Sequence, residues 1–297
     1  MPEEDERNET VLTIHDSGAV LDVAEDGEPV LAFHYTGVPK PYIHPLHLPG
    51  GGVVTNALPH DHLHHRGLWL TWPKVNGINF WEEHFAPEQT GDIRHRSFEV
   101  CAADATGARF TSRQEWVTRS GQCLLDGRFA LTVSSVQGGE RLLDIQVALR
   151  PVAGPVELGT PPQYHGLGYR CARSMDRGRI LNANGDEGPD ATKGVGAAWC
   201  SYSGRLDGIE RADLAVSGDG WASVTMFDHP ENPRHPTPWF TMNQPFGFIA
   251  PALSYATPYV IPAGERLVLR YGLLVQHGLA RSEQLDAHHR AWMTASA

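Results

Sequence analysis

The chain has 297 residues, with 24 lysines and arginines against 35 aspartates and glutamates, a formal net charge of −11. Such a surface repels phosphate backbones and anionic membranes, so we expect neither a nucleic-acid partner nor a membrane partner. Hydrophobic residues make up 41% of the chain, enough for a sizeable core. We expect a disordered acidic tail over residues 1–9 and a single domain over residues 10–297.

The start of the chain is acidic and lacks the basic-then-apolar order of a secretory signal. No stretch approaches the roughly 20 apolar residues that cross a bilayer. The four cysteines form no CxxC pair, so free buried thiols are expected at Cys101, Cys123, Cys171 and Cys200. These features together predict a cytoplasmic protein.

A histidine cluster over residues 60–66 is the most unusual feature of the sequence. If the segment is extended, His60, His62 and His64 point to one side and His65 points to the other. Two imidazoles spaced as H-x-H can bind one metal ion, which makes His60, His62 and His64 candidate ligands of a divalent metal cofactor. Alternatively, His62, His64 and His65 could be catalytic acid/base groups, since histidine titrates near neutral pH. They could also be buried and hydrogen-bonded structural residues.

Tryptophans flank this cluster and could stack on the C–H faces of a sugar, while polar neighbours bind its hydroxyls. Trp69 and Trp72 could equally be core residues. Glu82 and Glu83 could contribute to an acid/base pair or form a solvated rim. Over the whole chain, the candidate substrate-binding residues are His44, Arg66, Trp69, Asn76, Trp81, Arg170, His229 and Trp239.

Further along, apolar residues alternate with polar ones over 129–133, 143–149 and 267–275, the pattern of half-buried strands. Gly and Asn turn signals recur between these runs. Only the segment from Arg281 to Met293 reads as a helix, with Ser282 as N-cap and Leu285 and Trp292 on one face. The pattern predicts a mainly β fold, an antiparallel β-sandwich with a short C-terminal helix. A barrel or jelly roll is the competing architecture.

Two later stretches could complete a catalytic site. His165 and Arg170 lie in a strand-like run over residues 163–170, from which both could project into a cleft. Asp228 opens a proline-rich polar loop over residues 228–236, which suits a binding rim. We expect His165 and Asp228 to be catalytic together with the histidine cluster. A rigid surface turn is the structural alternative for the loop.

At these positions the sequence resembles a bacterial family labelled "methane oxygenase PmoA family". The resemblance rests mainly on Asp61-His62-Leu63-His64-His65-Arg66-Gly67-Leu68-Trp69 and on Val75-Asn76-Gly77-Ile78-Asn79-Phe80-Trp81. It implies a fold similar to the β-supersandwich of aldose mutarotases (galactose-mutarotase-like) and a role beside sugar catabolism. The label borrows the name of an integral membrane subunit, which a chain without a membrane-spanning segment cannot be.

The residue types favour a carbohydrate-active enzyme that acts on a sugar or an oxidised sugar derivative by His/carboxylate acid–base chemistry. Hydrolysis, elimination and epimerisation each need a paired proton donor and acceptor. The expected partner is therefore a small sugar-like molecule. Two other functions stay open: a metal-dependent oxygenase or hydrolase, and a non-catalytic sugar-binding module.

Overall fold

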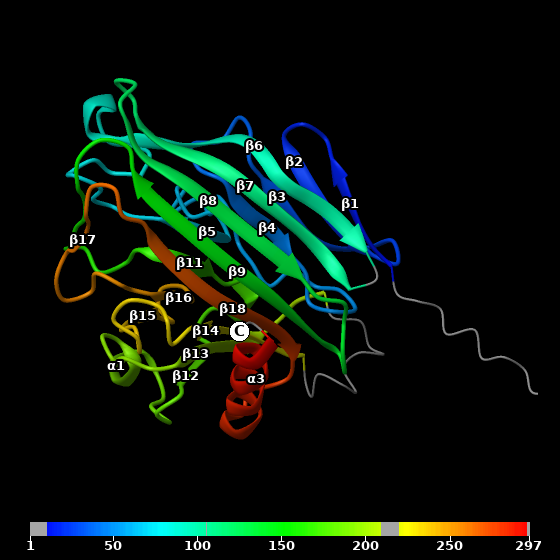
Figure 1. The fold of residues 1–297 in the computed structure, drawn as a ribbon. Coiled ribbons are helices and arrows are strands. Elements are labelled where there is room, and N and C mark those ends of the chain that lie inside the picture. The colour runs from blue at the N-terminus through cyan, green and yellow to red at the C-terminus, as the bar shows by residue number, and fades with distance from the viewer. Residues whose placement is uncertain (1–10, 105, 209–219, 296–297) are drawn as a thin grey trace, which may run out of the picture.

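A computed structural model describes residues 11–104, 106–208 and 220–295, and within them the chain forms two large antiparallel sheets (Figure 1). The first sheet has eight strands in the order β1-β2-β3-β4-β5-β11-β16-β15. Its strands are β1 (Leu12–Asp16), β2 (Val20–Glu25), β3 (Glu28–His34), β4 (Tyr42–Leu46), β5 (Leu68–Thr71), β11 (Gly166–Arg170), β15 (Trp239–Met242) and β16 (Phe248–Pro251).

The second sheet also has eight strands, in the order β12-β13-β14-β18-β9-β8-β7-β6. Its strands are β6 (Gly91–Asp104), β7 (Gly107–Thr118), β8 (Cys123–Val133), β9 (Glu140–Pro151), β12 (Arg179–Asn182), β13 (Trp199–Arg205), β14 (Trp221–Asp228) and β18 (Leu267–His277). Neither strand order closes on itself, so the sandwich prediction is confirmed and the barrel alternative is wrong.

Short elements complete the described part of the fold. A two-stranded ribbon pairs β10 (Val156–Leu158) with β17 (Tyr259–Ile261). The helical pieces are η1 (Pro87–Gln89), η2 (Arg173–Met175), α1 (Pro189–Thr192) and α3 (Ser282–Ala295). None of the helices in the described ranges is both long and apolar enough to cross a membrane. The predicted acidic tail over residues 1–9 lies outside these ranges.

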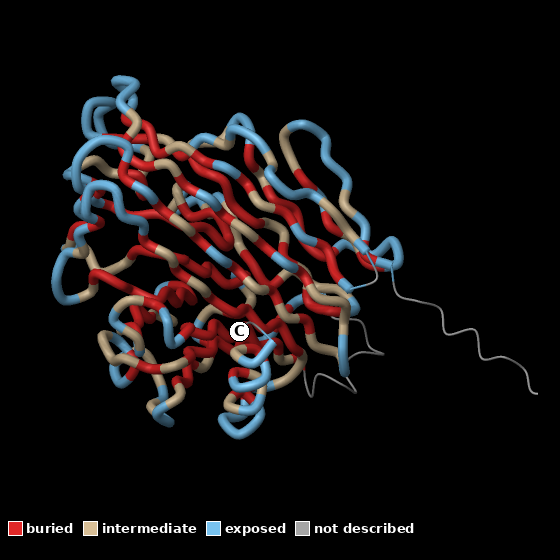
Figure 2. Tube along the Cα trace, viewed as in Figure 1, coloured by how far each residue is buried: buried red, intermediate tan, exposed pale blue. Residues whose placement is uncertain are grey.

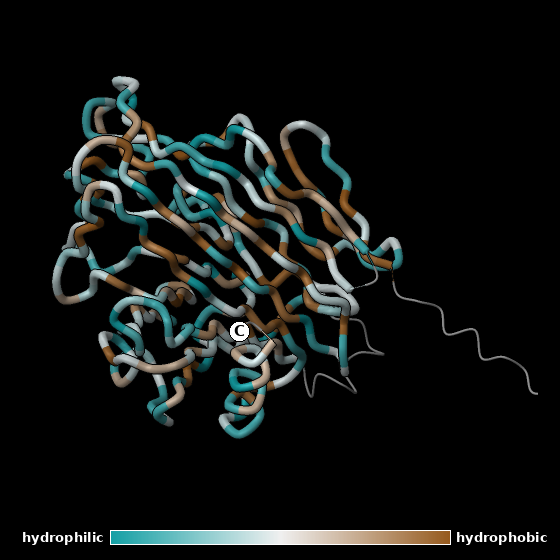
Figure 3. The backbone as a smooth tube through the Cα atoms, in the orientation of Figure 1, coloured by the Kyte–Doolittle hydropathy of each residue, from teal (hydrophilic) through white to brown (hydrophobic). Residues whose placement is uncertain are grey.

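The sequence periodicity places the core between the two sheets. Strands β8 and β9 alternate buried and less buried residues, as predicted, and hydrophobic and hydrophilic positions alternate along them (Figure 3). In β18 the predicted alternation holds only at its start, because every residue from Tyr271 to Gln276 is buried. The main core cluster draws Leu68 and Tyr169 from the first sheet and Ile145 and Leu273 from the second. Buried residues run through the middle of the strands while exposed residues gather in the connecting loops (Figure 2).

The C-terminal helix is confirmed with small changes at its ends. It spans Ser282–Ala295, so Ser282 lies in the helix rather than before it, and Leu285 N–H donates to Arg281 O at 3.0 Å. Leu285 and Trp292 are buried on one face, as expected, and pack on the outer side of the second sheet. The cysteines are free, but only Cys171 and Cys200 are buried; Cys101 is exposed and Cys123 is half-buried, contrary to the expectation that all four are buried.

Candidate functional site

The histidine segment is not extended, so the predicted alternation of its side chains is wrong. His62 N–H donates to Pro59 O at 3.0 Å and His65 N–H donates to His62 O at 2.9 Å, which makes two successive turns. Such turns let neighbouring residues face the same side. His62, His64 and His65 therefore share one pocket, whereas His60 is exposed and outside it.

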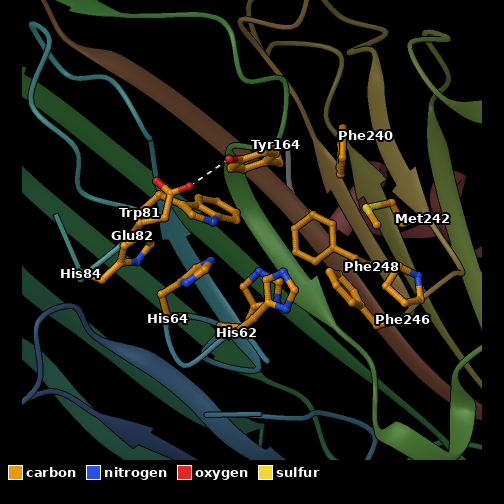
Figure 4. Close-up of a pocket in the computed structure, with 12 residues that line it drawn as sticks. His62, His64, Trp81, Glu82, His84, Tyr164, Phe240, Met242, Phe246 and Phe248 are labelled. Atoms are coloured by element: carbon orange, nitrogen blue, oxygen red, sulfur yellow. Dashed lines mark hydrogen bonds between the residues drawn. The ribbon is translucent and has the colours of Figure 1, made fainter. Parts of the chain in front are cut away.

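This pocket, which we term the histidine pocket, has a volume of about 360 Å³. Figure 4 shows the histidines and Glu82 on one side and a wall of aromatic side chains and Met242 on the other. The lining residues are His62, His64, His65, Trp81, Glu82, His84, Tyr164, Phe240, Met242, Pro245, Phe246 and Phe248. The pocket thus combines titratable groups with an apolar wall.

The pocket lies on the face of the first sheet that points away from the second sheet. Along β5, Leu68 and Leu70 enter the core between the sheets, so Trp69 between them faces the opposite side. There Trp69 packs against His65 and Trp81, with ring centroids 5.3 and 5.0 Å away. Trp69 is buried and forms the floor beneath the lining residues rather than a surface that touches a ligand.

Burial, more than the close packing of the imidazoles, controls their charge. The ring centroid of His65 lies 4.8 Å from that of His62 and 4.7 Å from that of His64. Burial, followed by the charge of Lys40, lowers the pKa of His64 to about 4. Burial, followed by the charges of His64 and Arg170, holds the pKa of His65 well below its usual range. Both imidazoles are therefore neutral near pH 7 and available as hydrogen-bonding or proton-accepting groups.

Glu82 is the carboxylate of the pocket, and the Asn-rich turn before it sets its position. Asn79 Oδ1 accepts hydrogen bonds from the backbone N–H groups of Trp81 at 2.8 Å and Glu82 at 3.0 Å, an Asx turn. Asn79 Nδ2 and the Tyr164 hydroxyl then donate to the two carboxylate oxygens, at 2.5 and 2.9 Å. Burial and the charge of Glu82 raise the pKa of Tyr164, so the phenol remains a donor.

Glu83, the next residue, belongs to a buried ion network behind the pocket. Its Oε1 accepts from Arg66 Nε at 3.2 Å and its Oε2 from Arg66 Nη2 at 2.5 Å, and Lys40 Nζ lies 2.9 Å from Oε1. Lys40 also donates to the backbone carbonyl of Trp81. Burial opposes ionisation of Glu83, yet the two cations outweigh it and hold its pKa below the usual range. Arg66 is therefore a structural neighbour of the pocket and not one of its lining residues.

Most of the later candidates lie outside the pocket. Asp228 is fully buried and accepts hydrogen bonds from Asn232 Nδ2, His235 Nδ1 and Thr237 N at 2.7–2.8 Å, which fixes its own loop. His165 is also fully buried, with its ring stacked on Trp72. His165 and Asp228 therefore do not converge with the histidine cluster, contrary to expectation.

The other candidate binding residues outside the pocket have structural partners instead. His44 bonds Thr55 Oγ1 through Nδ1 at 2.9 Å. Asn76 Oδ1 accepts from Glu157 N at 2.8 Å, and Asn76 with Gly77 forms a turn in which both have positive φ. His229 packs on Trp292, and buried Trp239 donates through Nε1 to Ala197 O at 2.9 Å.

The metal hypothesis finds no complete ligand set in the part of the chain that the structure describes. No group of three or more His, Cys, Asp or Glu side chains there is placed to hold a metal ion. His60 does not join His62 and His64, because the turn directs it outward.

Sequence reasoning missed the aromatic wall and Tyr164. Phe240 and Met242 come from β15 and Phe248 from β16, more than 150 residues after the cluster. A glycine makes room for this wall, since a Cβ at Gly168 would lie 3.0 Å from Phe248 and 3.2 Å from Trp81. The alternating glycines of Gly166-Leu167-Gly168 were the only available signal of close approach on that face.

We expect acid to destabilise the fold partly through His165. Its Nε2 accepts hydrogen bonds from Ser254 N at 2.9 Å and from Ser254 Oγ at 3.0 Å, and burial lowers its pKa to about 4. Between pH 6.5 and 4 the unfolded chain binds a proton that folded His165 does not, so stability falls as pH falls through this window. The shift corresponds to about 3 kcal/mol at most.

Urea denaturation between pH 7 and pH 4.5 measures this effect. His165→Gln is the control, because its amide oxygen can still accept from Ser254 but does not titrate. Its unfolding free energy should depend less on pH than that of the parent chain. Equal pH slopes for the two proteins would contradict the assignment.

Comparisons with known proteins show the family. A family model described as "Family of unknown function (DUF6807)" matches residues 20–290, and no curated protein matches the chain. One similar solved structure is a TPR-domain containing protein from Parabacteroides distasonis, at 12% identity, with a TM-score of 0.30 over 91% of this chain and 54% of that chain. The present chain thus spans about half of that protein, and so low a TM-score carries no argument.

The resemblance to the methane oxygenase PmoA family is overturned by this result, since the matching family model is a different one. The short motifs that suggested it, such as His64-His65-Arg66-Gly67, form the turns and buried network described above. Because the match covers nearly the whole described domain, the chain belongs to DUF6807, a family of unknown function.

Proposed function

We propose that this protein is a carbohydrate-active enzyme that acts on a sugar or an oxidised sugar derivative by acid–base chemistry in the histidine pocket. The observation that carries the proposal is the shared pocket of His62, His64 and His65, with Glu82 beside them and an aromatic wall opposite. A proton acceptor and a donor on one ligand are the minimum for epimerisation or elimination.

The composition of the pocket favours proton transfer over two-carboxylate glycoside hydrolysis. Glu82 is the only carboxylate among the lining residues that the structure describes, because Glu83 turns to Lys40 and Arg66. Glycosidases of the common kind need two carboxyl groups across the scissile bond. Neutral imidazoles, by contrast, can accept a proton from a bound ligand and return it to that ligand. Among the three reactions considered, epimerisation and elimination therefore fit best.

The aromatic wall supports a sugar-like ligand. Phe240, Phe246 and Phe248 present apolar faces opposite the histidines and Glu82, and sugars stack their C–H surfaces on such faces while their hydroxyls bond polar groups. A volume of about 360 Å³ is in the range of small-molecule sites. The net charge of −11 also disfavours polyanionic ligands.

Replacing His64 with alanine should lower turnover about 100-fold or more, the usual contribution of a general acid or base. His60→Ala is the matched control, because His60 lies in the same loop but outside the pocket. The assay screens monosaccharides, uronates and keto-sugars for turnover by NMR. Binding is followed by intrinsic tryptophan fluorescence, to which Trp81 in the pocket contributes. Both variants should keep a melting temperature close to that of the parent.

The outcomes separate the functions that remain. Turnover lost in His64→Ala but kept in His60→Ala supports the enzyme. Saturable binding of a sugar without any turnover would instead make the chain a sugar-binding module. Equal behaviour of the two variants, or silence across the whole panel, would contradict a role of the histidine pocket in sugar chemistry.

A further inference from the structure

One histidine of the pocket rests on a buried arginine. Arg170 ends strand β11, is 2% exposed, and its guanidinium carbon lies 3.6 Å from the ring centroid of Phe246. Its Nη1 lies 3.5 Å from Nδ1 of His65. Arg170 does not line the histidine pocket itself, so any effect on a ligand must act through His65 or Phe246.

The direction of this hydrogen bond is fixed by chemistry. A guanidinium has five N–H donors and no acceptor, so Arg170 can only donate. Nδ1 of His65 must then be the unprotonated nitrogen that accepts. Because a neutral imidazole carries one proton, that proton sits on Nε2. The positive charge of Arg170 and the burial of the ring both oppose a second proton on His65.

The protonated nitrogen is available to a ligand. His65 Nε2 has no hydrogen-bond partner in residues 11–104, 106–208 and 220–295. It is also not among the fully buried, unpaired polar atoms of those residues, so it is accessible from the pocket. Since His65 lines the pocket, this nitrogen can donate into the cavity. A fixed donor at the floor of an apolar cavity favours a ligand that presents an acceptor oxygen there.

We infer that Arg170 is a positioning residue that holds His65 as an Nε2–H donor, and that the pocket takes a carbonyl-containing sugar whose carbonyl oxygen accepts this hydrogen bond. The inference rests on the proposed function and names its substrate class. A neutral imidazole that donates to a carbonyl oxygen stabilises the enolate formed when an adjacent C–H bond breaks.

The chemistry balances without a cofactor. The proton of the carbon next to the carbonyl passes to the imidazole of His62 or His64, and the C–H electron pair forms a C=C bond. The carbonyl π pair moves to the oxygen, which His65 holds. If the planar enolate turns its other face to this imidazole before the proton returns, the carbonyl is restored with inverted configuration, and no electron or atom is gained or lost.

The tautomer can be measured without any ligand. Two-bond ¹H–¹⁵N NMR spectra of histidine-labelled protein distinguish Nε2–H, Nδ1–H and imidazolium rings, and the spectrum of His65→Ala identifies the His65 signals. We expect the Nε2–H form of His65 at pH 7. An Nδ1–H ring or an imidazolium overturns the inference, whether or not the protein proves to be an enzyme.

Variants of Arg170 test its positioning role. Arg170→Met removes the donor and should shift His65 toward a mixture of tautomers, whereas Arg170→Lys keeps a donor and should retain more of the Nε2–H form. An unchanged tautomer in a folded Arg170→Met protein overturns the role of Arg170. If Arg170→Met does not fold, the Arg170→Lys variant still tests the positioning role of Arg170. Loss of the Nε2–H form in Arg170→Lys, which keeps a donor, would also overturn that role.

A matched pair of probes tests the substrate class. Dihydroxyacetone and glycerol have the same three-carbon skeleton and differ in one carbonyl. Dihydroxyacetone should bind about tenfold more tightly, which is the worth of one good hydrogen bond, and His65→Ala should abolish this preference. Equal affinity for the two probes, or no binding of dihydroxyacetone, while His65 keeps its Nε2–H tautomer would overturn the carbonyl assignment. The proposed acid–base chemistry would then still be tested by the screen of monosaccharides, uronates and keto-sugars.

Discussion

Replacing Glu83 with glutamine is expected to destabilise the fold by about 3–5 kcal/mol, the usual effect of breaking a buried ion pair from one side. Lys40 is 1% exposed and Arg66 is 7% exposed, and both lose their counter-charge in this variant. Chemical denaturation at pH 7 measures the loss. Because Lys40 also bonds the carbonyl of Trp81, the same variant should weaken ligand binding in the histidine pocket.

Glu82→Gln is the matched control, since Glu82 is the same residue type one position earlier. Its side chain accepts hydrogen bonds from the neutral Asn79 and Tyr164, so we expect a loss of only about 1–2 kcal/mol. Raising the pH should restore part of the stability of Glu83→Gln. Burial already lowers the pKa of Lys40 to about 8, so Lys40 can fold uncharged at alkaline pH. Equal losses in the two variants would contradict the ion network.

Replacing Asp228 with alanine should also cost about 3–5 kcal/mol, because a buried, fully engaged carboxylate is removed and its donors are left behind. The backbone N–H of Thr237 and the side chain of Asn232 are buried and would lose their acceptor. Since Asp228 does not line the histidine pocket, ligand affinity measured below the melting temperature of the variant should stay close to that of the parent.

Glu231→Ala provides the control in the same loop. The Glu231 side chain is 90% exposed, and such substitutions are usually within 0.5 kcal/mol of neutral. If Asp228→Ala keeps its stability but loses all turnover, Asp228 is a catalytic residue after all and the structural assignment is wrong. The urea midpoint and the turnover number of the two variants, measured side by side, distinguish these cases.

The sequence alone indicated the sandwich and singled out a histidine segment that lines a pocket. Leu143, Ile145 and Val147 alternate with polar residues because one face of each strand is buried, and β9 and the sandwich follow from this local rule. The C-terminal helix likewise follows from its apolar face. The histidine cluster was predicted to be the functional segment, and three of its members line the histidine pocket.

Only the tertiary structure decided which residues share that pocket. Turns at Pro59–His65 replace the extended strand, so neighbours that alternation would separate lie together. Glu82 and Glu83 are identical in type, yet one meets Tyr164 and the other meets Lys40 and Arg66. These partners are up to 82 residues away in the sequence. A carboxylate or imidazole becomes structural when it is buried beside a specific partner, and faces a ligand when it is not. That partner is distant in the sequence, so no local pattern reveals it.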